Sequence, residues 1–142
     1  MKIINIYTDG GSRGNPGPAA IGVFIEGDGL VLGKIGKRIG KNTNNFAEYS
    51  AILEGLDFII QNKDLIGKDS KVNFFMDSQL AYSQIVGIYK IKNSILRELI
   101  FKIREKEAEI KLPIVYSHIP RERNKEADKL VNLALDNKLE LI

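Results

Sequence analysis

Four acidic residues occupy positions from which their carboxylates could meet. Asp9 and Asp77 each end an apolar, strand-like run, whereas Glu48 and Asp128 fall near the starts of two helical patterns. Four close carboxylates repel one another and raise one another's pKa, an arrangement that a fold tolerates mainly when cations lie between them. The spacing of these acids therefore raises the hypothesis of a shared metal site.

The other residue types indicate which metal such a site would hold. The chain has no cysteine and a single histidine, so a cluster would offer oxygen ligands almost alone. Oxygen ligands favour hard cations, Mg²⁺ or Mn²⁺. Two such ions about 3.5–4 Å apart can activate a water and stabilise the leaving oxygen of a phosphodiester. The acids therefore predict metal-dependent phosphodiester hydrolysis.

Each acid also has a simpler structural interpretation. Asp9 precedes two glycines and could belong to a turn, and Glu48, three residues after Asn45, could complete a capping box. Asp77 could cap the helix that follows it, and Asp128 could be solvated on the flank of its helix. Taken singly, these interpretations are favoured; taken together, the four positions favour a common site.

The periodicity of apolar residues predicts the elements that would position these acids. Strands are expected at 2–9, at two segments within 19–39 that flank the Gly27–Gly29 turn, at 71–76 and at 112–119. Helices are expected from Asn44, from Ser78, around 95–103 and from near Glu122. This order predicts an α/β fold whose five-stranded mixed sheet has three antiparallel and two parallel strands, with helices on both faces. If the first and fourth strands are neighbours, their carboxyl ends place Asp9 beside Asp77.

Size and composition exclude several classes of protein. The 142 residues, 44% hydrophobic and 27% charged, predict a single globular domain over 1–142. A net charge of +3 is compatible with a polyanionic partner but does not require one. Because the chain shows no signal-peptide pattern, no cysteine and no apolar run of membrane-spanning length, we expect a cytoplasmic protein without a membrane partner. We also expect a monomer.

Four segments of the chain closely resemble the signature segments of type 1 ribonuclease H. They are YTDGGSRGNPGPAAIG, NTNNFAEYSAI, MDSQLAYSQI and HIPRERNKEAD, in matching order and spacing from Lys2 to about Asn137. The resemblance implies the ribonuclease H-like fold and a metal-dependent endonuclease that cuts the RNA strand of RNA–DNA hybrids, leaving 3′-hydroxyl and 5′-phosphate ends. It also implies two Mg²⁺ ions per site with substrate bound, replaceable by Mn²⁺. The family's metal-binding acids fall on Asp9, Glu48, Asp77 and Asp128.

The resemblance assigns roles to two further residues near the last acid. His118, ten residues before Asp128, matches the family's mobile catalytic histidine, which could relay protons or help the product to leave. Taken alone, a histidine at a strand end is more often structural. Asn124 matches a family asparagine, and its alternative role is that of a helix N-cap.

Substrate contacts are also implied by the resemblance. Positions matching Asn15, Asn44 and Asn45 reach the minor groove of the hybrid in the family, where an amide can bond to the ribose 2′-hydroxyl. Thr43 and Gln79 match positions close to the bound strands, and we expect Arg13 to meet phosphate. The alternative for each is local turn hydrogen bonding. The small residues after Asp9 are expected to let the nucleic-acid backbone approach the metals.

The chain departs from many family members between the second and third helices. VGIYKIKNSI, with Lys90 and Lys92 and no tryptophan, replaces a long basic protrusion and resembles the subgroup that lacks it. Fewer phosphate contacts predict weaker binding, and some relatives of this kind accept other RNA-containing duplexes.

Three other functions are compatible with parts of the sequence. They are another two-metal nuclease of the same fold, a non-catalytic nucleic-acid-binding module, and a dinucleotide-binding enzyme. The last is disfavoured because a second strand, not a helix, follows the glycines at 10, 11 and 14.

Overall fold

A five-stranded mixed sheet forms the centre of the protein, which a computed structural model describes over residues 2–142. The strands are β1 (Ile3–Ser12), β2 (Gly17–Gly27), β3 (Leu30–Asn42), β4 (Lys71–Met76) and β5 (Ile114–His118), in the spatial order β3-β2-β1-β4-β5. β1, β2 and β3 pair antiparallel, whereas β4 lies parallel to both β1 and β5. The predicted mixed α/β sheet, with the first and fourth strands as neighbours, is therefore confirmed.

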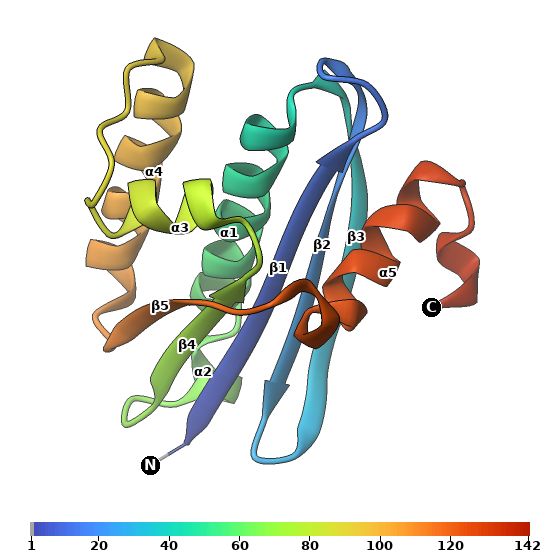
Figure 1. Ribbon diagram of the computed structural model, residues 1–142. Helices are drawn as coiled ribbons and strands as arrows, with labels where there is room; N and C mark the ends of the chain where they lie inside the picture. The colour runs from blue at the N-terminus through green and yellow to red at the C-terminus, as the bar shows by residue number, and fades with distance from the viewer. Residues whose placement is uncertain (1) are drawn as a thin grey trace.

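Helices cover both faces of this sheet (Figure 1). They are α1 (Asn44–Gln61), α2 (Lys63–Ile66), α3 (Gln79–Ile85), α4 (Ser94–Ile110) and α5 (Lys125–Leu135), with 3₁₀ turns at Arg121–Arg123 and Leu139–Leu141. The larger core joins α1 and α4 to one face of the sheet. A smaller cluster joins α5 to β2 through Val131 and Ala134 of the helix and Ala20 of the strand. Among residues 2–142, no helix combines the length and the apolar character needed to cross a membrane.

The first strand does not end at its glycine pair, contrary to the sequence-based expectation. β1 continues to Ser12, and Gly10 and Gly11 pair with Ile21 and Ala20 of β2. A Cβ on Gly10 would overlap backbone atoms of Ala47 and Glu48 in α1, at separations below the 3.0 Å that real Cβ contacts respect. Glycine is thus needed here so that α1 can lie directly on the strand.

Two other boundaries differ from the expectation. The last helix begins at Lys125 and not near Glu122, because 121–123 form a separate 3₁₀ turn that ends at Asn124. The four-residue helix α2 was not predicted, since so short a segment shows no helical period in the sequence. The turn at Asp28-Gly29 was predicted correctly, and both residues have the positive φ of a tight hairpin.

Candidate active site

Three of the four predicted acids lie together beside the carboxyl end of β4. Asp9 is in β1 and Asp77 directly follows β4, the parallel neighbour of β1. Glu48 joins them from α1. One carboxylate oxygen from each of these residues lies within 4.8 Å of the other two. The topology of adjacent parallel strands therefore brings together acids that are 68 residues apart in sequence.

The structure excludes the turn and helix-capping roles considered above for three of the acids. Thr43, not Asn45, caps α1 by accepting a 3.2 Å hydrogen bond from the backbone N–H of Phe46, so Glu48 is outside any capping box. Ser78 caps α3 in the same way, which leaves the Asp77 carboxylate free of that task. Asp9 pairs with Gly22 in the ladder and belongs to no turn.

Asn124 holds the site together from the start of α5. Its Nδ2 donates 3.0 Å to Oδ2 of Asp77 and 2.9 Å to the carbonyl oxygen of Thr8. The side chain is 1% exposed and forms no cap hydrogen bond of its own helix. Asn124 is thus positioned as an N-cap, but its amide links the start of α5 to Thr8 within β1 and to Asp77 directly after β4.

The fourth acid, Asp128, lines the same hollow of about 510 Å³ as the other three. It lies outside the close group of three, yet its charge is near enough to raise the pKa of Asp9. The hollow also contains Arg121, whose positive charge lowers the pKa of Glu48. Arg121 was missed by the sequence analysis because a 3₁₀ turn has no apolar period that would indicate where its side chain points.

Burial and mutual repulsion perturb the acids strongly. Asp9 and Glu48 are each 8% exposed. Burial, followed by the charges of Asp77 and Asp128, raises the pKa of Asp9 to about 8. Burial, followed by the charges of Asp9 and Asp77, also raises the pKa of Glu48 well above its usual range, against the opposing effects of the Gly10 N–H and Arg121. Carboxylates in this arrangement can ionise together only when positive charge lies among them.

His118 lies at the edge of this group. It ends β5, is exposed, and its Nε2 lies 3.2 Å from the carbonyl oxygen of Asp77, to which it donates when that nitrogen carries the proton. The ring of Tyr82 is 6.1 Å away, centroid to centroid. The imidazole therefore has access both to solvent and to the acidic site.

Two of the predicted substrate-binding amides are engaged by the local backbone. Oδ1 of Asn15 accepts 3.0 Å from the N–H of Asn44, and Oδ1 of Asn44 accepts 2.8 Å from the N–H of Ser12. These bonds fix the orientation of both amides and leave their NH₂ groups to donate elsewhere.

The remaining predicted contacts lie in two hollows at this end of the protein. Asn15, Thr43 and Asn45 line one of about 370 Å³, and Gln79 lines the acidic one. Arg13 lies at the rim of the acidic hollow, where it forms a 2.7 Å ion pair with Asp136 and a 3.5 Å hydrogen bond to Asn132. Any phosphate that meets Arg13 must therefore compete with this ion pair.

Known proteins resemble this chain along nearly its whole length. The ribonuclease HI of Halobacterium salinarum is 38% identical over 139 residues, which cover 94% of this chain and 65% of that protein. The bifunctional protein Rv2228c of Mycobacterium tuberculosis is 38% identical over 138 residues, which cover 96% of this chain but 36% of that protein. The chain thus spans less than two thirds of the length of these relatives.

Solved structures agree with the sequence comparison. LC11-RNase H1, isolated from compost by a metagenomic approach, has a TM-score of 0.88 and 45% identity, with 98% of this chain and 99% of that chain covered. LC11-RNase H1 in complex with an RNA/DNA hybrid gives a TM-score of 0.86 and 44% identity, with 96% and 99% covered. The profile of the family described as RNase H matches residues 1–136, so this chain belongs to the RNase H family.

Proposed function

We propose that this protein is a metal-dependent endonuclease that hydrolyses the RNA strand of RNA–DNA hybrids. The observation that carries the proposal is the group of Asp9, Glu48 and Asp77, three carboxylates within 4.8 Å of one another at the edge of a hollow. The likeness of this chain to LC11-RNase H1, whose structure has been solved with an RNA/DNA hybrid, supports the choice of substrate. We further propose that the protein acts as a monomer.

The residues present fit a pair of hard divalent cations. All the ligand atoms are oxygens, and the raised pKa values of Asp9 and Glu48 indicate carboxylates that need a positive neighbour. In this proposal Asp9, Glu48, Asp77 and Asp128 hold two Mg²⁺ ions, or Mn²⁺ in their place. Bound there, such ions would activate water and neutralise charge on the leaving oxygen.

The chain's own groups would perform the remaining tasks. Asn124 keeps the Asp77 carboxylate in one orientation through its 3.0 Å hydrogen bond. His118 is exposed and lies beside the Asp77 carbonyl oxygen, where it can move protons to and from solvent as the RNA is released with 3′-hydroxyl and 5′-phosphate ends. Arg121 supplies a cation beside the acids that can face a substrate phosphate.

Substrate would lie across the two neighbouring hollows. Asn15 and Asn44 have their amide oxygens fixed by backbone N–H groups, so each presents its NH₂ group as a donor of defined direction. Together with Thr43, Asn45 and Gln79, these donors suit ribose 2′-hydroxyls and phosphates. The connection over 86–93 is short, and we propose that the protein therefore binds weakly and also accepts other RNA-containing duplexes.

The proposal can be tested with strand-labelled duplexes. RNA–DNA hybrid, RNA–RNA, DNA–DNA and single-stranded RNA are each incubated with the protein in Mg²⁺, Mn²⁺ or EDTA. We expect internal cuts in the RNA strand of the hybrid and none with EDTA. Cleavage in EDTA, or DNA cleavage at an equal rate, would reject the proposal.

A matched pair of variants tests the acids themselves. Asp77→Asn should abolish cleavage and leave hybrid binding measurable, because the amide keeps the shape but loses the charge. Asp69→Asn makes the same chemical change at an exposed position in the turn before β4 and should cut like the parent. Near-full activity of Asp77→Asn would show that the acids are assigned wrongly.

A further inference from the structure

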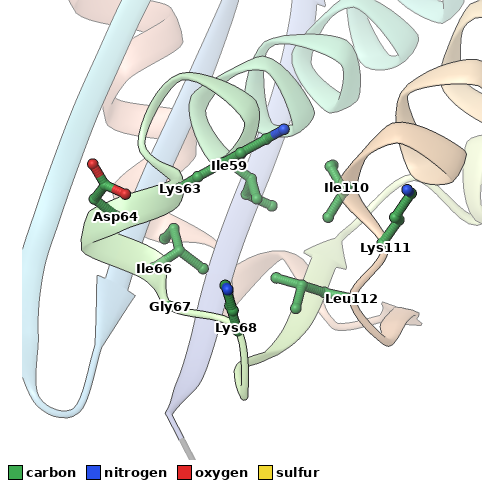
Figure 2. Close-up of a pocket in the computed structure, with 9 residues that line it drawn as sticks. All are labelled: Ile59, Lys63, Asp64, Ile66, Gly67, Lys68, Ile110, Lys111 and Leu112. Carbon is green, nitrogen blue, oxygen red and sulfur yellow. The ribbon is translucent and has the colours of Figure 1, made fainter.

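A third hollow, of about 490 Å³, lies at the opposite end of β4 and β5 from the acids. Its apolar lining is aliphatic and comes from Ile59, Ile66, Ile110 and Leu112. Figure 2 shows these side chains grouped around an open space between α1, α2 and the end of α4. The volume is sufficient for one or two large side chains or a small organic molecule.

Three lysines surround the mouth of this aliphatic hollow. Lys63 comes from α2, Lys68 from the turn before β4, and Lys111 from the C-cap of α4. In Figure 2 the three lysines stand on different sides of the space, and the carboxylate of Asp64 points away from it. Within residues 2–142, none of the three lysines forms an ion pair with an acidic side chain. The lining of the hollow therefore carries three lysines against one aspartate, which is a net positive charge.

The backbone at Lys111 has an unusual conformation for a lysine. Its φ of 58° and ψ of 31° lie in the left-handed region, where a helix C-cap favours glycine or asparagine. A long cationic side chain is the less favourable choice for that conformation on backbone grounds alone. A lysine at this end of α4 places its positive charge beside the negative end of the helix dipole.

The combination of an aliphatic floor and a positive rim selects one kind of ligand. Nucleic acid would satisfy the lysines, but its phosphates would leave the apolar floor unfilled, and the lining offers no aromatic ring on which a base could stack. A compact anion would reach only one part of a rim that is positive on several sides. We infer that the hollow binds an acidic segment of a partner protein, with one large apolar side chain inserted between flanking carboxylates.

Such a partner could bind while substrate is engaged. The hollow lies beside the amino ends of β4 and β5, whereas Asp77 and His118 lie at their carboxyl ends. Bound protein would therefore leave the acidic site open. The position of the hollow therefore suits a partner that recruits the protein to its substrate without blocking the acidic site.

The inference can be tested on the full chain with short fluorescent peptides in which aspartates flank one leucine. We expect saturable binding by anisotropy, and about tenfold or greater loss when the leucine is replaced by serine. In methyl NMR spectra, the peptide should shift Ile59, Ile66 and Leu112, and should not shift Ile52 of the distant part of α1. Equal binding of the leucine and serine peptides, or shifts confined to the acidic end, would overturn the inference.

Variants of the lysines complete the test. Lys63→Ala, Lys68→Ala and Lys111→Gly should each weaken peptide binding about two- to fivefold, as expected for exposed charge pairs. Lys111→Gly is the sharpest of them, because it removes the ammonium group and also relieves the left-handed backbone, so the fold should not lose stability. Lys102→Ala removes the same charge from an exposed position on α4 outside the hollow, and should bind like the parent.

Two further outcomes would reject the partner class. If Lys102→Ala weakens binding as much as Lys111→Gly, the peptide recognises only net charge. If single-stranded oligothymidylate competes with the peptide for the same methyl groups, the hollow belongs to a nucleic-acid-binding surface.

Discussion

Replacing Gly10 by alanine should displace the helix that carries Glu48. A Cβ at this position would lie closer than 3.0 Å to backbone carbon and oxygen of Ala47 and to the backbone nitrogen of Glu48. None of these atoms can rotate away as the end of a flexible side chain could. The strand is also fixed there, because Gly10 is paired with Ile21 of β2. The first turns of α1 must therefore move outward.

The size of the effect follows from this overlap. Carbon atoms prefer separations of about 3.5–4.0 Å, so α1 must shift by roughly 1 Å. Forcing a group into a packed interior costs about 1–3 kcal/mol of unfolding free energy. A displacement of about 1 Å at a catalytic group can cost about a hundredfold in rate. We expect a folded variant of reduced stability whose affinity for Mg²⁺ and rate of hybrid cleavage fall much further than its stability.

Three measurements and one control variant test this expectation for Gly10→Ala. Urea unfolding gives the stability, titration calorimetry gives Mg²⁺ binding, and the labelled hybrid gives the rate. Gly11→Ala adds the same methyl group to the next residue, where the nearest atom is Cγ1 of Val131 at an ordinary 3.5 Å. Its unfolding free energy should stay within about 0.5 kcal/mol of the parent. If Gly10→Ala matches the parent in stability, metal affinity and rate, α1 does not pack on β1 as described here.

Three other predictions follow from the electrostatics and hydrogen bonds of the site. Because the pKa of Asp9 rises from 3.8 to about 8 on folding, the unfolded chain loses this proton first. The metal-free protein should therefore lose unfolding free energy as pH rises from 3.8 to about 8. Urea melts in EDTA at several pH values should show this loss, and Asp9→Asn should flatten the dependence on pH. Asn124→Ala leaves the Thr8 carbonyl and the Asp77 carboxylate without their shared donor. It should lower the unfolding free energy in urea melts by about 1–3 kcal/mol and weaken Mg²⁺ binding in calorimetry. Unchanged metal affinity would show that this amide has no positioning role. Arg121→Ala removes the cation that lowers the pKa of Glu48, so the acidic limb of the pH–rate profile should move to higher pH; a shift to lower pH would contradict the assigned direction.

The convergence of the acids could be predicted because it follows from topology. β1 carries Asp9, and its parallel neighbour β4 is followed directly by Asp77, so the two carboxylates lie on the same side of the sheet. The helical period of α1 could likewise place Glu48 on or beside the buried face. These inferences need only the order of the elements and the side on which each residue lies.

Other features could not be predicted because they depend on tertiary contacts. The sequence shows that Gly10 is small, but not that the backbone of Ala47 occupies the space a side chain would fill. Arg121 reaches the acidic hollow from a 3₁₀ turn, and the aliphatic hollow forms only when α2 meets the end of α4. Each of these features joins segments that are far apart in the chain.

The two helical acids are placed by one repeated device. Glu48 follows Ala47, whose backbone lies against Gly10, and Asp128 follows Ala127, whose carbonyl oxygen would overlap a Cβ on Gly22. Both alanines are fully buried, and Gly22 is the ladder partner of Asp9. Each helix thus touches the sheet through an alanine on a glycine, and the next residue is directed toward Asp9. Close packing from the two faces of the sheet therefore opposes the repulsion among the carboxylates, so divalent ions should stabilise the fold as well as supply the chemistry.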